Sequence, residues 1–193
     1  MANTQAPFGF RPTRRVDGAD PNYAMMPARL IAQAATFAVG YGDIMASLNT
    51  GFISICASTA TQAQGIFQSC QYYDTNFQQW VFNNYLPGTQ TPSDNIQAFS
   101  ISDVKQVFEV QSNGAAITTA DIGINATFAG NGTPNSYSHI SKAALDPSTL
   151  STNSAFQFRI VGLSTVVGND NAASFNTVEV ILNAADFNST TGV

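Results

Sequence analysis

Charged side chains are scarce in this sequence. Asp, Glu, Lys and Arg make up only 10% of its 193 residues, against roughly a quarter in ordinary soluble proteins. Neutral polar residues replace them: 17 Asn, 17 Ser, 19 Thr and 13 Gln. A surface of this kind loses less on desolvation than a charged one, since interface cores are depleted in Lys, Glu and Asp. We therefore expect much of the surface to be covered in an assembly; the alternative is a monomer of low charge.

Histidine and cysteine are also rare, which argues against the commonest metal centres. The chain has one histidine and two cysteines, and neither Cys56 nor Cys70 belongs to a Cys-x-x-Cys pair, so the usual zinc spacing is missing. EF-hand spacing is missing as well. Cys56 lies in an apolar run and is predicted to be a buried thiol; a disulfide with Cys70 remains open if their strands pair. We expect no metal and no cofactor.

Long hydrophobic runs are absent too. The first residues contain no apolar core of a secretory signal peptide. The longest apolar stretch, residues 28–39, is interrupted by Gln33 and Thr36 and is too short to span a bilayer. These absences predict a protein that is made in the cytoplasm and has no membrane partner. The same stretch favours a strand over a short helix, because Pro27 and Gly40 bracket it.

Catalytic motifs are not visible. The only histidine, His139, follows Ser136 and Ser138, but the sequence has no Gly-x-Ser-x-Gly elbow. The glycines at 40 and 42 lack the third glycine and the helix of a dinucleotide-binding loop. Glu109 and Glu179 are the only glutamates, which leaves little material for a pair of catalytic carboxylates. We expect neither an enzyme nor a small-molecule substrate.

The charges that are present are unevenly distributed. Residues 30–193 contain three cations and ten acids, a net charge of −7, while four of the seven cations precede residue 30. Nucleic-acid binding would require a basic stripe on the body. The acidic body therefore argues against a nucleic-acid partner.

Alternation of apolar and polar residues dominates the chain after residue 24. This period of two, with β-branched and aromatic residues, is the pattern of β-strands, and Gly, Asn and Pro mark the breaks between strands. The pattern predicts an all-β barrel or sandwich over residues 24–193, with less than about 15% helix. The inward-facing residues of its two clearest strands are Phe156, Phe158, Ile160, Val178, Val180 and Leu182.

Residues 1–23 form a different unit. Prolines at 7, 12 and 21 favour extended backbone and exclude a continuous helix, so we expect an extended N-terminal arm. The arm has no apolar periodicity of its own, and its large side chains are expected to bind a partner; the alternative is packing on the chain's own body. The expected binding residues are Phe8, Phe10, Arg11, Arg14 and Arg15.

The opening of the chain resembles a known family. Residues 6–14, APFGFRPTR, are similar to the opening of many small proteins encoded with the heads of tailed bacteriophages. Weaker similarity extends over the rest of the chain, at residues 40–43, 65–73, 107–111, 121–126, 159–163 and 177–180. The resemblance implies a capsid decoration or cement protein on the outer surface of the phage head, with a β-barrel or β-tulip-like body. It also implies the major capsid protein as partner and a homotrimer as the oligomer.

Two other functions remain open. One is a different structural role in the virion, in a minor capsid, head–tail or fibre-associated protein. The other is a carbohydrate-binding β-sandwich, because aromatic side chains can serve as sugar platforms. The aromatic residues concerned are Tyr72, Tyr73, Trp80 and Tyr85.

Overall fold

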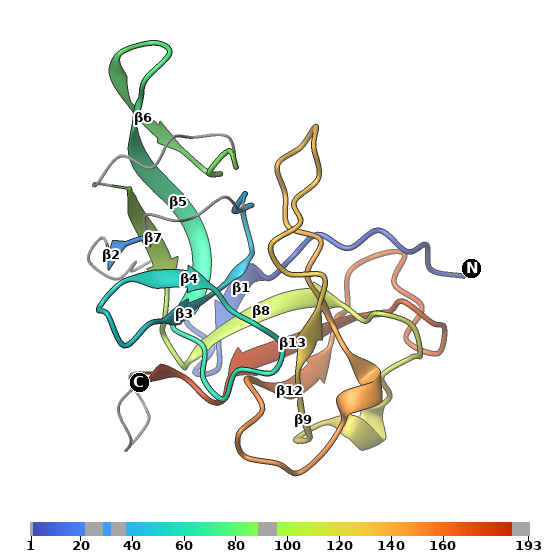
Figure 1. Ribbon diagram of the computed structural model, residues 1–193. Helices are drawn as coiled ribbons and strands as arrows, with labels where there is room; N and C mark the ends of the chain where they lie inside the picture. Colours follow the sequence, from blue (N-terminus) through green and yellow to red (C-terminus); the bar gives the residue numbers. More distant parts are fainter. Residues whose placement is uncertain (1, 22–28, 32–37, 89–95, 187–193) are drawn as a thin grey trace.

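The computed structural model describes residues 2–21, 29–31, 38–88 and 96–186. Within these residues the regular elements are antiparallel β-strands and two short 3-10 turns, η1 (Thr119–Asp121) and η2 (Pro147–Thr149), with no α-helix. The strands form several sheets that pack together (Figure 1). The predicted all-β class is therefore confirmed.

A five-stranded sheet forms the lower layer in Figure 1. Its order is β1 (Arg11–Arg15), β8 (Gln106–Gln111), β13 (Thr177–Leu182), β12 (Phe158–Leu163) and β9 (Asn125–Ala126). The inward-facing residues predicted for its central strands are confirmed, except that Phe156 is only half-buried. The fully or almost fully buried ones are Phe158, Ile160, Val178, Val180 and Leu182.

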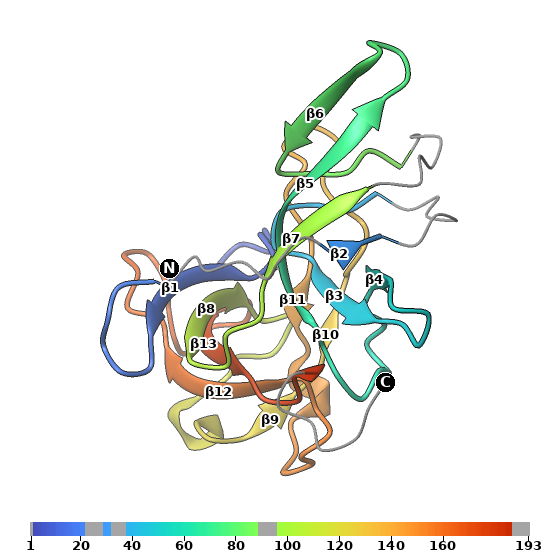
Figure 2. The same cartoon turned by 90° about the vertical axis from the view of Figure 1, so that its left-hand side faces the viewer.

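A six-stranded sheet forms the second layer. Five strands follow the order β2 (Arg29–Leu30), β7 (Gln97–Ile101), β5 (Gly65–Asp74), β3 (Ile44–Ser47) and β4 (Ile53–Ile55). The sixth, β6 (Gln79–Asn83), pairs with the far half of β5. The hairpin of β5 and β6 projects beyond the rest of the molecule in two perpendicular views (Figures 1 and 2). A small ladder, β10 (Phe128–Ala129) with β11 (Ala144–Leu145), lies beside the sheets.

The two faces of the six-stranded sheet belong to different cores. Ile44, Ile66 and Ile101 lie in the main core with the five-stranded sheet. Phe67 and Cys70 face the other way, into a second cluster. The register of β5 shifts between Phe67 and Ser69. Because this bulge inserts one extra residue, Phe67 and Cys70 lie on the same face although they are three positions apart.

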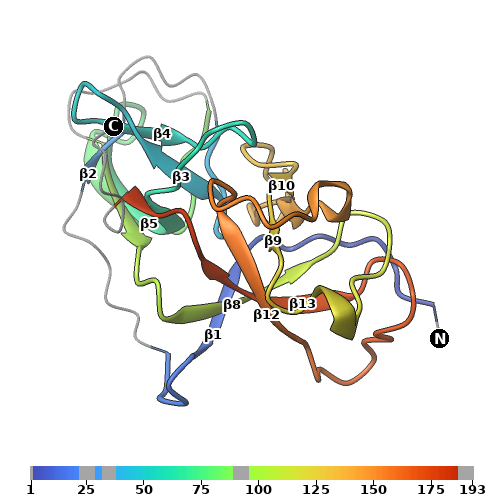
Figure 3. The same cartoon turned by 90° about the horizontal axis from the view of Figure 1, so that it is seen from below.

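The N-terminal segment, residues 2–21, differs from the separate arm that we expected. Its strand β1 is the edge strand of the five-stranded sheet and pairs with β8 (Figure 3). Before β1, the Asn3 amide donates to the carbonyl of Asp170 at 2.8 Å, and the Ala6 N–H donates to Gln111 Oε1 at 2.8 Å. Residues 11–15 are thus part of the five-stranded sheet, and the boundary placed between residues 23 and 24 lies outside the described residues.

The stretch 28–39 is only partly described. In the stretch 28–39, Arg29–Leu30 is a strand as favoured, while residues 32–37 lie outside the described residues. The described part of the chain contains no helix of the length and hydrophobicity needed to cross a membrane.

Candidate functional site

Phe10, predicted to bind a partner, is instead a core residue. Its side chain is 0% exposed and stacks on Phe158, with ring centroids 4.2 Å apart and planes 19° apart. Its N–H donates to the carbonyl of Gly42 at 3.1 Å. The segment therefore packs on its own body at this point, which was the alternative to partner binding.

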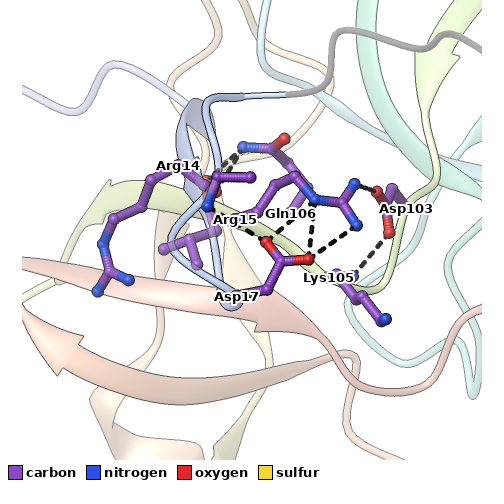
Figure 4. A network of polar contacts seen from close by, with 8 residues as sticks. Arg14, Arg15, Asp17, Asp103, Lys105 and Gln106 are labelled. Atoms are coloured by element: carbon purple, nitrogen blue, oxygen red, sulfur yellow. Dashed lines mark hydrogen bonds and ion pairs between the residues drawn. The ribbon is translucent and has the colours of Figure 1, made fainter.

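Arg14 and Arg15 are paired within the chain. Arg15 reaches both Asp17, in the turn after β1, and Asp103, ahead of β8, whereas Arg14 points away toward β13 (Figure 4). There Arg14 Nη2 contacts Glu179 Oε2 at 2.5 Å. The hydrogen bond to Glu179 raises the pKa of Arg14, and the hydrogen bond from Arg15 lowers the pKa of Asp17.

The arginines of β1 lie next to acidic residues on the neighbouring strands of the same sheet. Glu109 on β8 lies directly opposite Glu179 on β13, and like charges in this position destabilise a sheet. The next strand, β1, places Arg11 opposite Glu109 and carries the Arg14 that pairs with Glu179. The arginines of the acidic body's edge strand thus compensate charges of that same body.

Three of the five predicted residues remain accessible, and one of them, Arg14, is already paired with Glu179. Arg11 is exposed and Phe8 is half-buried. The guanidinium carbon of Arg11 lies 4.8 Å from the centroid of the Phe8 ring, a distance typical of a cation–π contact. This pair is the part of the predicted site that stays available to a partner.

A second candidate lies on the projecting hairpin. We call it the aromatic face: Tyr73 on β5, Trp80 and Phe82 on β6, and Phe99 on β7. Tyr73 is opposite Trp80, with ring centroids 5.9 Å apart, and Phe82 is 5.7 Å from Phe99. Trp80 is 53% exposed and Phe82 61% exposed.

The tip of the hairpin carries another exposed aromatic side chain. Phe77 is 74% exposed, and the turn that carries it is held by Asp74, whose Oδ1 accepts from the N–H of Asn76 at 2.8 Å and of Phe77 at 3.3 Å. Scattered exposed apolar residues are ordinary, but a contiguous group indicates an interaction surface. The hairpin therefore has the character of an interface.

The sequence contains a signal for this surface that the alternation pattern does not reveal. Of the fifty residues 44–93, only Asp74 is charged. We call residues 44–93 the neutral region; its described part contains β3, β4, β5 and β6. Depletion of charge is the compositional signature of an interface core.

The aromatic residues considered as a sugar platform do not lie together on one accessible surface. Tyr72 is 3% exposed and belongs to the second core cluster on the opposite face of β5. Tyr85 stacks on His139, with ring centroids 3.8 Å apart. Of the four, Tyr73 and Trp80 are on the aromatic face.

The cysteines and the histidine show no reactive arrangement. Cys56 and Cys70 are free thiols in separate core clusters, and burial raises the pKa of each to about 12. His139 is covered on one side by the Tyr85 ring. Among the described residues, no group of three or more His, Cys, Asp or Glu side chains is placed to hold a metal ion.

Comparison with known proteins identifies no relative. No family model, no curated protein and no solved structure matches the chain.

Proposed function

We propose that this chain is a structural protein of a tailed-phage head, which binds the major capsid protein on the outer surface and stabilises the shell. The observation that carries the assembly role in this proposal is the neutral region, which projects exposed aromatic side chains on a hairpin of β-strands. Such a surface costs little to desolvate and is suited to permanent contact. The resemblance of residues 6–14 to phage head proteins supplies the biological setting.

The fold suits a protein that holds a shell together. A cement protein needs many simultaneous contacts more than one deep pocket. Antiparallel sheets with two buried clusters form a stiff body, so contact residues on different elements keep their spacing. A preorganised body loses less conformational entropy on binding than a flexible one.

We assign the shell contact to Phe8 and Arg11. Both belong to the set expected from the sequence, and both remain accessible beside the anchored strand β1. Arginine is suited to this contact because its planar guanidinium binds carboxylates bidentately. Since β1 is already held in a sheet, this contact requires no ordering of a free arm.

Heads that lack this protein should bind the purified wild-type chain, and Arg11→Ala should weaken that binding by roughly tenfold, equivalent to about 1.4 kcal/mol. Arg11→Ala should also reduce the dependence of binding on salt, because a charged contact is lost. Co-sedimentation of protein with expanded heads over a range of salt concentrations measures both.

Arg159→Ala is the matched control, because Arg159 is another exposed arginine and lies on β12, three strands away from β1 in the order of the same sheet. It should bind heads as the wild type does. If Arg11→Ala and Phe8→Ala both bind heads as the wild type does, Phe8 and Arg11 do not form the shell contact. Shell-wide copy number by mass spectrometry of virions separates a decoration protein from a head–tail or fibre-associated one, which is present in few copies.

A further inference from the structure

The aromatic face continues a surface that is covered elsewhere in the molecule. At one end of β5 and β7, Ile66 and Ile101 are paired and fully buried in the main core. Farther along the same face of β7 stands Phe99, next to Phe82 on β6. The five-stranded sheet covers the first part of this face, and in the described residues the part at β6 stays exposed. Among the described residues, no second sheet therefore covers the face at β6.

Strand β6 also offers a free edge. Within the described part of the chain it pairs only with β5, and the pairing has no bulge. Its residues, Gln79–Asn83, include no charge and no proline. Monomeric proteins usually protect such an edge with lysine, proline or a bulge. An unprotected neutral edge beside exposed Trp80 and Phe82 is expected to pair with another strand.

The distribution of charge favours a second copy of this chain as the source of the strand that pairs with β6. The neutral region contributes −1 to the net charge of −5, so the rest of the chain carries −4. Two copies that approach through their acidic bodies repel each other, whereas two neutral regions meet without repulsion. Two copies can therefore meet through this region without the repulsion that opposes contact between their acidic parts.

We propose that a second copy of this chain covers the aromatic face, with the free edge of β6 and the side chains of Trp80 and Phe82 in contact with the neutral region of that copy. This inference rests on the proposed structural role and names the partner of one surface in that assembly. Two-fold pairing and a closed ring of three both bring neutral regions together.

The double variant Trp80→Lys/Phe82→Lys should separate the copies. Both side chains are more than half exposed, so lysine is compatible with the folded subunit and places charges in the contact. We expect the wild type to be an oligomer at micromolar concentration, and the variant to dissociate about 30-fold more readily or further, as for loss of an interface hot spot. Light scattering on the full chain over a concentration series measures this.

Val167→Lys is the control, because Val167 is 100% exposed on a different loop, and it should leave the oligomer intact. Gln79→Lys keeps every aromatic side chain and charges the edge of β6; it should also weaken the oligomer, and serves if the double variant fails to fold. A monomeric wild type, or an oligomer that both variants leave unchanged, overturns the inference.

Head binding distinguishes this inference from the proposed function. If the wild type self-associates through the face but binds no heads, the inference stands and the head role fails. If the wild type is monomeric and the double variant loses head binding, the face belongs to the capsid protein and the second-copy inference fails.

Discussion

Replacing Phe10 with alanine should lower the free energy of unfolding by about 3–5 kcal/mol. The ring is fully buried, stacks on Phe158 and belongs to the main core cluster. Removal of the ring takes away its transfer free energy and leaves a cavity between the two sheets. Urea unfolding monitored by circular dichroism measures the change.

Phe8→Ala is the matched control two residues away. Phe8 is only half-buried, so its removal should cost about 1 kcal/mol or less. Deletion of residues 1–15 should be more damaging than Phe10→Ala, because it also removes strand β1 from the edge of β8. If the truncated chain keeps wild-type stability, residues 1–15 are a separate arm, as the sequence predicts, and not part of the body.

The role of Phe10 illustrates a limit of sequence patterns. Its ring partner, Phe158, lies 148 positions away, and no local periodicity relates the two. Strand β1 is short, contains Pro12 and shifts register before Arg14, so alternation is too brief to be recognised. In contrast, β13 alternates over its whole length, and its buried face was predicted correctly.

The arginines show the same limit in electrostatic terms. The distribution of charge along the sequence predicts arginines that face an acidic body and are free for a partner. Two of the three acids that pair with them, Asp103 and Glu179, come from distant parts of the chain, and only Asp17 is a neighbour in sequence. Net charge by region indicates that opposite charges are available, but only the strand order determines which ones meet.

The aromatic face was only half predictable. Alternation correctly places Trp80 and Phe82 on one side of a strand and Val81 on the other. Both sides are apolar, so the pattern does not reveal which side the body covers. The nearly charge-free run of residues 44–93 is the compositional pattern that the proposed interface would leave in the sequence, and alternation alone does not bring it out.

Asp43→Asn should lower the free energy of unfolding by about 1–3 kcal/mol, since it removes an acceptor from a buried site. Asp43 is 0% exposed and links its own segment to the connection between β10 and β11. Its Oδ2 accepts from the N–H of Gly40 at 2.7 Å, and its Oδ1 accepts from the hydroxyl of Ser141 at 2.5 Å and the N–H of Gly132 at 3.2 Å. An asparagine has one carbonyl oxygen for these donors, and its amide group would face another donor.

The same carboxylate predicts a pH dependence of defined sign. Burial raises the pKa of Asp43 above its ordinary value of 3.8, although the hydrogen bonds from Ser141, Gly40 and Gly132 oppose this. Between pH 3.8 and the raised value, the folded state binds more protons at this group than the unfolded state does. This carboxyl therefore contributes more stability as the pH falls through that window. The difference in unfolding free energy between wild type and Asp43→Asn should accordingly increase toward low pH.

Unfolding by urea at a series of pH values tests both parts of this prediction. Asp146→Asn is the matched control, because Asp146 accepts from the N–H of Ser148 at 3.0 Å in an exposed hydrogen bond at the start of η2. Asn and Asp serve about equally well at this position, so the control should change stability little. If Asp43→Asn is as stable as the wild type at neutral pH, the two segments are held by other contacts, and the buried carboxylate is not what joins them.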